Sequence, residues 1–316
     1  MDGLTKVKLI GSSSHFPIWK TLCDSPSNPK FSLSQGSLTD QNSASILVFS
    51  PENEAAITQF VDSFSELSPE QPIEHTILDA KVSFPLFSIP ETTEFFNHFF
   101  LPENKNLDIL FRLLMKKNST QIKESTLKNT LSNPESLKSY TPKTSLEKST
   151  LTEKLEKILT TQQINPKQIS LALTAFEELF MNAITHSRKS FQENFQPEAP
   201  SIHAPLTFSK TSLLIEVAFG VNQEWVALEV MDSGGTLIKK ELLQKVLGKQ
   251  NKKAIPVDPS APSLGIGLLE LVSNGWTLFF DCIQGEMTRV QAYYPRNTAF
   301  AQRDQTTRAL SIRHQL

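Results

Sequence analysis

The chain has 316 residues, enough for about two domains of ordinary size, and its 39% hydrophobic content supports buried cores. Its 31 Lys and Arg residues nearly balance 33 Asp and Glu residues, so no overall field would recruit nucleic acid or an anionic membrane. Cys23 and Cys282 are too few for a disulfide framework and fit a reducing compartment. Because the sequence also lacks a signal-peptide pattern and any run of about 18 apolar residues, we expect a cytoplasmic location and no membrane partner.

The first third of the chain alternates short apolar runs with stretches of helical periodicity. The predicted strands are residues 6–10, 46–49, 84–89 and 95–101, and the predicted helices are residues 53–67 and 107–117. Strands that alternate with helices favour a parallel sheet covered by helices. We therefore predict an α/β domain over residues 1–117.

The end of this domain, FFLPENKNLDILFRLLMKK, resembles the last strand and helix of a response-regulator receiver domain. The resemblance implies a flavodoxin-like fold, but the functional residues of receivers are replaced. Leu101 stands at the lysine position, Ser12, Ser13 and Ser14 follow the first strand in place of acidic residues, and Ser50 stands at the phosphoacceptor position. We expect a docking or regulatory module that lacks the phosphoacceptor, and the alternative is an unrelated small α/β domain.

Residues 118–147 are rich in Ser, Thr, Asn and Lys and contain Pro134 and Pro142. Such a composition buries little apolar surface and predicts a flexible linker. Helical periodicity resumes at Leu151, and we predict a second domain over residues 148–297. The remaining residues, 298–316, contain several arginines and predict a solvated, mobile basic tail.

The second domain opens with an apolar helix predicted over residues 171–187, LALTAFEELFMNAITHS. Glu178 and Asn182 are four residues apart, so a carboxylate and an amide share one face of the helix. Glu177 points about 100° away around the helix axis. His186 fits the C-terminal end of this helix, where a side chain that can carry positive charge is favourable.

Three further motifs follow this helix. They are Asp232-Ser-Gly234-Gly235, Gly265-Ile-Gly267-Leu268 and Gly285-Glu-Met-Thr288. Each motif alone is weak evidence of function, whereas their order and spacing together are specific.

The surrounding pattern gives each motif a structural setting. Residues 212–219 and 225–231 alternate as an antiparallel hairpin, which places Asp232 at a strand end, where its carboxylate can accept a hydrogen bond from an exocyclic amine. Gly234 and Gly235 permit positive φ and the close approach of a flat ring. Gly265 and Gly267 precede an apolar helix at residues 268–272, whose N-terminus suits phosphate oxygens. The predicted closing strands are residues 277–280 and 288–294.

Together the four motifs resemble those of the GHKL, or Bergerat-fold, ATP-binding superfamily, with a match over residues 151–295. The resemblance implies helices packed on a mixed, mainly antiparallel sheet, with ATP and Mg²⁺ as cofactors. It further implies a Mg²⁺ ligand at Asn182, adenine recognition by Asp232 and Thr288, and a phosphate-covering lid over residues 236–264. The glycines and the leucine at 234, 235, 265, 267 and 268 would contribute to the nucleotide site.

Two observations select a branch of this superfamily. There is no histidine between His98 and His186 to act as phosphoacceptor, and only about twenty residues follow Pro295, too few for a transducer domain. The pattern of Glu178, Asn182, Ala183 and His186 resembles the first motif of anti-sigma factor serine/threonine kinases. That resemblance implies Glu178 as general base, an antagonist protein as substrate, a sigma-like target, and a homodimer. The alternatives are an ATP-gated interaction module and a histidine kinase-like protein that acts on a separate phosphotransfer partner.

Overall fold

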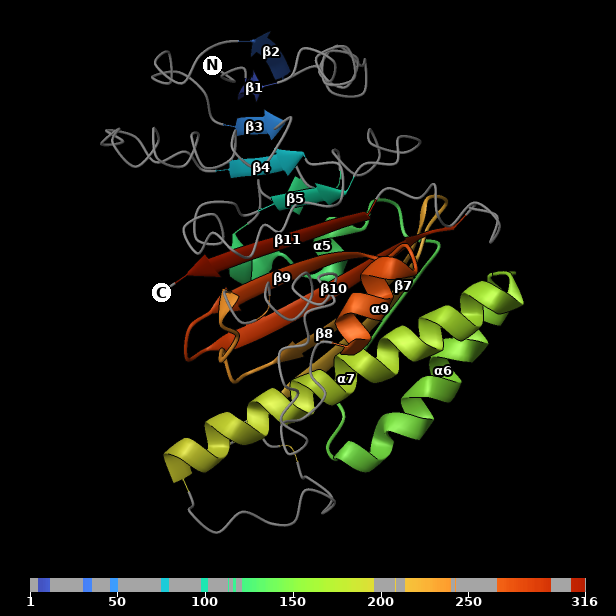
Figure 1. The fold of residues 1–316 in the computed structure, drawn as a ribbon. Helices are drawn as coiled ribbons and strands as arrows, with labels where there is room; N and C mark the ends of the chain where they lie inside the picture. Colours follow the sequence, from blue (N-terminus) through green and yellow to red (C-terminus); the bar gives the residue numbers. More distant parts are fainter. Residues whose placement is uncertain are drawn as a thin grey trace.

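A computed structural model shows the chain as an α/β protein, and its described strands form one mixed sheet of eleven strands (Figure 1). The strand order is β2-β1-β3-β4-β5-β11-β9-β10-β8-β7-β6. The structure describes residues 5–11, 31–35, 46–50, 75–79, 98–101, 113, 116–117, 121–195, 208, 214–239, 242, 266–296 and 308–315.

The N-terminal strands form the parallel part of the sheet. They are β1 (Thr5–Gly11), β2 (Phe31–Gln35), β3 (Ile46–Ser50), β4 (His75–Asp79) and β5 (His98–Leu101). The strands predicted at residues 6–10 and 46–49 are confirmed, and β5 confirms the end of the run at 95–101. β2 and β4 were not predicted, whereas the strand predicted at 84–89 and the helix predicted at 53–67 lie outside the described residues.

The remaining strands form a six-stranded part of the sheet that is mainly antiparallel, as expected. They are β6 (Ser136–Tyr140), β7 (Ile215–Val221), β8 (Trp225–Asp232), β9 (Thr277–Ile283), β10 (Met287–Pro295) and β11 (Arg308–Gln315). Only the β9–β11 pair is parallel among these six strands, and β11 also pairs antiparallel with β5. The predicted β7–β8 hairpin is confirmed.

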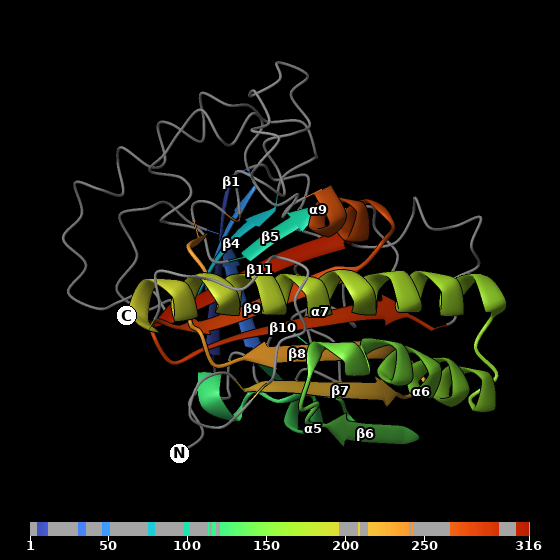
Figure 2. The ribbon, with the colours of Figure 1, turned by 90° about the horizontal axis from the view of Figure 1, so that it is seen from below.

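Three helices cover one face of the six strands, which we call the front face (Figures 1 and 2). They are α6 (Lys148–Thr161), α7 (Pro166–Phe195) and α9 (Ile266–Ser273). The alternating residues of the strands that include Val217, Leu228 and Phe280 are buried against these helices. The opposite face, which we call the back face, contacts the short helix α5 (Leu127–Thr130).

The sequence around α7 explains its position. Pro166 fits the first turn, and the Asn165 side chain accepts a hydrogen bond from the Lys167 N–H at 2.9 Å. The helix continues to Phe195, beyond the predicted end at residue 187, so His186 does not lie at its terminus. Its buried residues recur at helical spacing and face the core. They are Ala172, Ala175, Phe176, Leu179, Phe180, Ala183 and Ile184.

The expectation of a flexible linker at residues 118–147 is wrong over its described part. Residues 121–147 contain η4 (Ile122–Glu124), α5, β6 and η5 (Ser145–Glu147). The few apolar side chains of this segment are enough to anchor it, because Leu127 and Leu131 are buried on the back face of the sheet. Backbone groups of this segment are also bonded by polar side chains of the strands, and β6 pairs with β7 at the sheet edge.

The expectation of a solvated tail at residues 298–316 is likewise wrong for its last part. Residues 308–315 form β11, which lies between β5 and β9. Leu310 and Ile312 are buried on the front face, and Arg313 Nε donates to Asp281 Oδ1 at 2.6 Å on the back face. Among the described helices, none has the length and apolar character needed to cross a membrane.

Candidate functional site

Glu178 and Asn182 share one face of α7, as their spacing predicted. Asn182 Nδ2 donates to Glu178 Oε1 at 3.0 Å, and both residues are half-buried. Glu177 differs from its neighbour, because it is exposed and its Oε1 lies 3.6 Å from Lys148 Nζ on α6. The helix therefore aims one glutamate into the protein and the other toward solvent.

Gly267 brings the third motif against the first. A Cβ atom at this position would lie 1.9 Å from Glu178 Cδ and 2.2 Å from each carboxylate oxygen. Only a glycine lets α9 approach the Glu178 carboxylate this closely. The following residue, Leu268, is buried in the core and holds α9 against α7. Gly265 lies outside the described residues.

Asp232, Thr288 and Cys282 form a row across three neighbouring strands, which we call the front row. Thr288 of β10 pairs in register with Asp232 of β8 and with Cys282 of β9. Asp232 is 3% exposed, and its Oδ1 accepts a hydrogen bond from the Gly234 N–H at 2.8 Å. The second and fourth motifs therefore meet at the end of β8, on the face that α7 covers.

The Thr288 hydroxyl in this row is buried and makes no hydrogen bond of ordinary geometry within the described part of the chain. Its polar neighbour is the Cys282 thiol, which is a weak hydrogen-bonding group. A buried hydroxyl without a strong partner is uncommon and fits a site that a ligand or an ordered water completes. Thr288 is one of the two residues for which the family resemblance implies adenine recognition.

Gly235 and Gly285 link the second motif to the turn between β9 and β10. Gly235 has φ +57°, and a Cβ there would lie 2.3 Å from the Ile283 carbonyl oxygen and 2.6 Å from the Gly285 nitrogen. The Gly285 N–H donates to the Gly235 carbonyl at 3.1 Å. The positive φ was predicted, but the close approach that requires glycine is to this turn of the protein itself.

Cys282 connects the front row to the start of the predicted lid. Its Sγ donates to the Leu237 carbonyl at 3.7 Å, and Leu237 is buried in the core. Burial raises the pKa of the thiol, so it stays protonated near neutral pH and has a structural part here. Residues 243–265, which make up most of the predicted lid, lie outside the described residues.

Asn182 has one side-chain oxygen that could bind a hard cation. The hydrogen bond to Glu178 uses the donor side of the Asn182 amide, so the amide oxygen is the atom that would ligate Mg²⁺. Magnesium prefers oxygen ligands and keeps several waters when one or two protein groups bind it with phosphates. Within the described ranges no cluster of three His, Cys, Asp or Glu residues could hold a metal ion.

A cavity of about 300 Å³ lies elsewhere, on the back side of the sheet. Its lining includes Lys116, Thr130, Asn222 and Trp225. Trp225 begins β8, whereas Asp232 ends it. The cavity is therefore at the opposite end of β8 from the front row, and none of the predicted site residues lines it.

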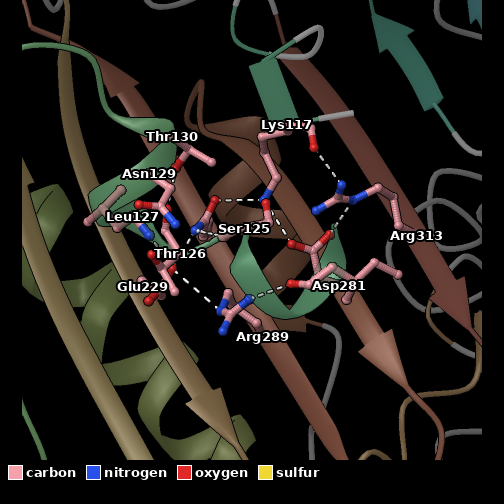
Figure 3. Close-up of polar contacts among 12 residues, drawn as sticks. Lys117, Ser125, Thr126, Leu127, Asn129, Thr130, Glu229, Asp281, Arg289 and Arg313 are labelled. Atoms are coloured by element: carbon pink, nitrogen blue, oxygen red, sulfur yellow. Dashed lines mark hydrogen bonds and ion pairs between the residues drawn. The ribbon is translucent and has the colours of Figure 1, made fainter. Parts of the chain in front are cut away.

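The polar residues that the sequence analysis missed lie on the back face of the same strands (Figure 3). This cluster, which we call the back network, consists of Lys117, Glu229, Asp281, Arg289, Gln291 and Arg313. The signal was present as charged and amide residues that alternate with the buried apolar residues of β8, β9, β10 and β11. Such alternation normally indicates a solvated face, which is why it was not recognised.

No model of a known protein family matches the chain, and no curated protein matches it either. The positions of the motif residues are therefore the observations that bear on function. Those positions bring Gly267 to Glu178, Thr288 to Asp232, and Gly285 to Gly235.

Proposed function

We propose that residues 148–297 are an ATP-binding domain of the GHKL type and that the chain is a serine/threonine kinase resembling anti-sigma factor kinases. One observation carries this proposal: four motifs far apart in sequence meet as two pairs. Gly267 contacts Glu178, and Thr288 lies beside Asp232 on the face covered by α7. Chance motifs would have no reason to converge in this way.

The strand order supports the interpretation of the N-terminal third. The parallel order β2-β1-β3-β4-β5 is that of flavodoxin-like folds, which include receiver domains. β3 ends at Ser50, so a serine stands where a receiver carries its phosphoacceptor aspartate. A regulatory domain without phosphoacceptor chemistry accords with both observations.

The residues of the site have complementary tasks in this proposal. ATP would supply the phosphoryl group, and Mg²⁺ would offset charge on the phosphates. Glu178 would accept the proton of a Ser or Thr hydroxyl of the substrate protein while the hydroxyl oxygen takes the γ-phosphoryl group and ADP leaves. Asn182 donates to the Glu178 carboxylate and would hold Mg²⁺ through its amide oxygen, while Asp232 and Thr288 would recognise adenine.

Calorimetric titration with Mg-ATP tests the binding part of the proposal. The wild type should bind, while Asn182→Ala and Asp232→Asn should weaken binding strongly. Met181→Ala, which truncates an exposed residue of the same helix, serves as a control that should bind normally. Unchanged affinity in both site variants would contradict the nucleotide site.

Phosphate transfer tests the kinase part. Mg-ATP and candidate antagonist proteins should yield acid-stable phosphoserine or phosphothreonine, and Glu178→Gln should abolish the product while ATP still binds. An acid-labile product would indicate a histidine kinase-like activity on a separate partner instead. The sigma-like target should bind in a manner that depends on nucleotide.

One observation favours the ATP-gated interaction module as second candidate. The Glu178 carboxylate is already bonded to Asn182 and packed against Gly267, an arrangement that also suits a purely structural link between α7 and α9. Pull-down experiments with and without ATP separate the two candidates, because the module captures its partner in an ATP-dependent way without transferring phosphate.

A further inference from the structure

Lys117 is the centre of the back network and is 1% exposed. Its Nζ donates to Asp281 Oδ2 at 3.0 Å and to Gln291 Oε1 at 2.6 Å, and it lies 4.9 Å from the centre of the Phe279 ring. Arg313 Nη1 donates to the Lys117 carbonyl at 2.6 Å while its Nε bonds Asp281 (Figure 3). The end of the helix predicted at residues 107–117 is thereby fixed to β9, β10 and β11.

Side chains of the strands also bind the backbone of the segment that follows. Arg289 donates to the Ile122 carbonyl at 2.7 Å and to the Lys123 carbonyl at 3.3 Å. Gln291 donates to the Ser125 carbonyl at 2.8 Å. Glu229 accepts from the Leu127 N–H at 2.7 Å and is also bonded by Gln291. Lys117 and residues 122–127 are therefore held by β8, β9, β10 and β11 together.

This attachment lies directly behind the front row. Arg289 pairs in register with Asp281, and the next pair along the same two strands is Thr288 with Cys282. Successive residues of a strand point to opposite faces, so one shift of β9 and β10 moves both sets of side chains. Only one residue step of backbone therefore separates the back network from the front row.

We propose that Lys117 is a positioning residue of the nucleotide site, and that through the back network it couples residues 121–131 to the front row of Asp232, Thr288 and Cys282. This inference rests on the proposed ATP-binding function. It adds a control element on the face opposite the nucleotide. The N-terminal third enters the second domain through this segment, so the coupling gives it a physical route to the site.

The burial of the network makes this coupling stiff. Separating Lys117 from Asp281 would leave two charges without partners in a region shielded from water, which is costly. The segment and the strands therefore move together or not at all. Coupling between two sites is reciprocal, so nucleotide that orders the front row must also tighten residues 121–131.

Lys117→Met in the full-length chain tests the proposal, and Lys123→Met is its matched control. Lys123 lies on the same segment but is 64% exposed, and its Nζ pairs with Glu286, which is 55% exposed. Lys117→Met should weaken Mg-ATP binding about tenfold, a typical strength for coupled sites, and should speed hydrogen exchange at the backbone amides of residues 232–234 and 288. Lys123→Met should change neither quantity. If Lys117→Met does not fold, Lys117→Gln keeps a hydrogen-bonding side chain without the charge.

Hydrogen exchange of the wild type with and without Mg-ATP separates coupling from a purely structural role. A purely structural Lys117 would not make exchange depend on nucleotide. Nucleotide should slow exchange across residues 121–131, and Lys117→Met should abolish this protection. If the wild type binds ATP but residues 121–131 show no protection, the coupling is refuted while the nucleotide site stands. If the wild type binds no ATP, the proposed function fails, and unchanged exchange at residues 232–234 in Lys117→Met then also refutes the positioning role.

Discussion

The two faces of the six-stranded part of the sheet differ in the kind of side chain that they bury. On the front face, α6, α7 and α9 bury aromatic and aliphatic side chains, and the polar residues Glu178 and Asn182 stay half-buried. On the back face, a short segment with few apolar residues is held by a buried ionic network. The front face supplies hydrophobic stability, whereas the charged groups of the back face pair with one another.

This difference explains how each face responds to change. Apolar packing tolerates small shifts at modest cost, because dispersion contacts are numerous and individually weak. A buried network of charges permits few arrangements, because each broken link leaves a desolvated group unpaired. We therefore expect the front face to determine how stable the domain is, and the back face to determine how its strands are aligned.

The largest effect is expected from the apolar core. Phe176 is fully buried, and its ring centre lies 5.5 Å from that of Phe180 and 5.1 Å from that of Phe219. Phe176→Ala should lower the free energy of unfolding by about 3–5 kcal/mol, measured by urea denaturation. Met181→Ala on the exposed side of α7 should cost much less. Equal losses in the two variants would contradict the assignment of the α7 faces.

The second effect should reveal the ionic character of the back face. Asp281→Asn leaves Lys117 and Arg313 without their carboxylate and should cost about 3 kcal/mol. The double variant Lys117→Met with Asp281→Asn should lose at least about 1 kcal/mol less than the sum of the two single losses. Strict additivity in this double-mutant cycle would show that the two side chains do not interact.

Much of the front face could be predicted from the sequence, because its signals are periodic. The alternation of residues 225–231 and the helical spacing around Glu178 correspond to β8 and α7. The spacing of the motifs did not reveal which of them touch. The contact between Gly267 and Glu178 depends on how α9 packs on α7, which is a tertiary property that no local pattern encodes.

The back face could not be predicted because its residues carry the signals of exposed positions. Lys117, Glu229 and Arg289 belong to types that are rarely buried unless paired, and their partners are distant in sequence. The same bias concealed β11, whose arginines suggested a solvated tail although Leu310 and Ile312 alternate with polar residues. Sequence composition therefore did not predict the elements that are held in place by polar contacts between residues distant in sequence.

The third effect concerns the contact between the first and third motifs. Gly267→Ala places a methyl group where the Glu178 carboxylate lies, so the glutamate must move and the variant should lose about 1–3 kcal/mol of stability. Phosphate transfer by this variant should also fall, because Glu178 is displaced from its position. Adding Glu178→Ala should recover part of the lost stability without the activity, measured by thermal unfolding. No recovery would show that the methyl group clashes with something other than Glu178.

The fourth effect is a pH dependence that belongs to the back face. Burial lowers the pKa of Lys117 from 10.5 to about 8, against the opposing influence of Asp281 and Glu229 and with a contribution from Arg313. Above about pH 8 the native state has released a proton that the unfolded chain retains, so the free energy of unfolding should rise with pH. The difference in free energy of unfolding between the wild type and Lys117→Met should rise with a slope that approaches about 1.4 kcal/mol per pH unit.

Lys117→Met is the necessary reference, because burial also raises the pKa values of Cys282 and Tyr293 above 9.0 and 10.0, and both groups act in the opposite direction as the pH rises. At each of these groups the unfolded chain ionises first, so stability is lost as the pH rises further. Denaturation of the wild type and of Lys117→Met should therefore be compared between pH 8 and pH 10. Parallel curves over this range would show that Lys117 does not titrate there.

The smallest effect should come from the glutamate that faces solvent. Glu177 is 51% exposed and pairs with Lys148 at 3.6 Å, so Glu177→Gln should change the free energy of unfolding by less than about 1 kcal/mol, because solvent screens such a pair. It should leave ATP binding and phosphate transfer intact, whereas Glu178→Gln, one residue further along, should abolish transfer. Assay of both variants with Mg-ATP decides the point, and loss of transfer in Glu177→Gln would show that the wrong glutamate has been assigned as the base. The two residues differ in chemistry only through their positions around α7, so the pair isolates what the orientation of a helix contributes to the proposed function.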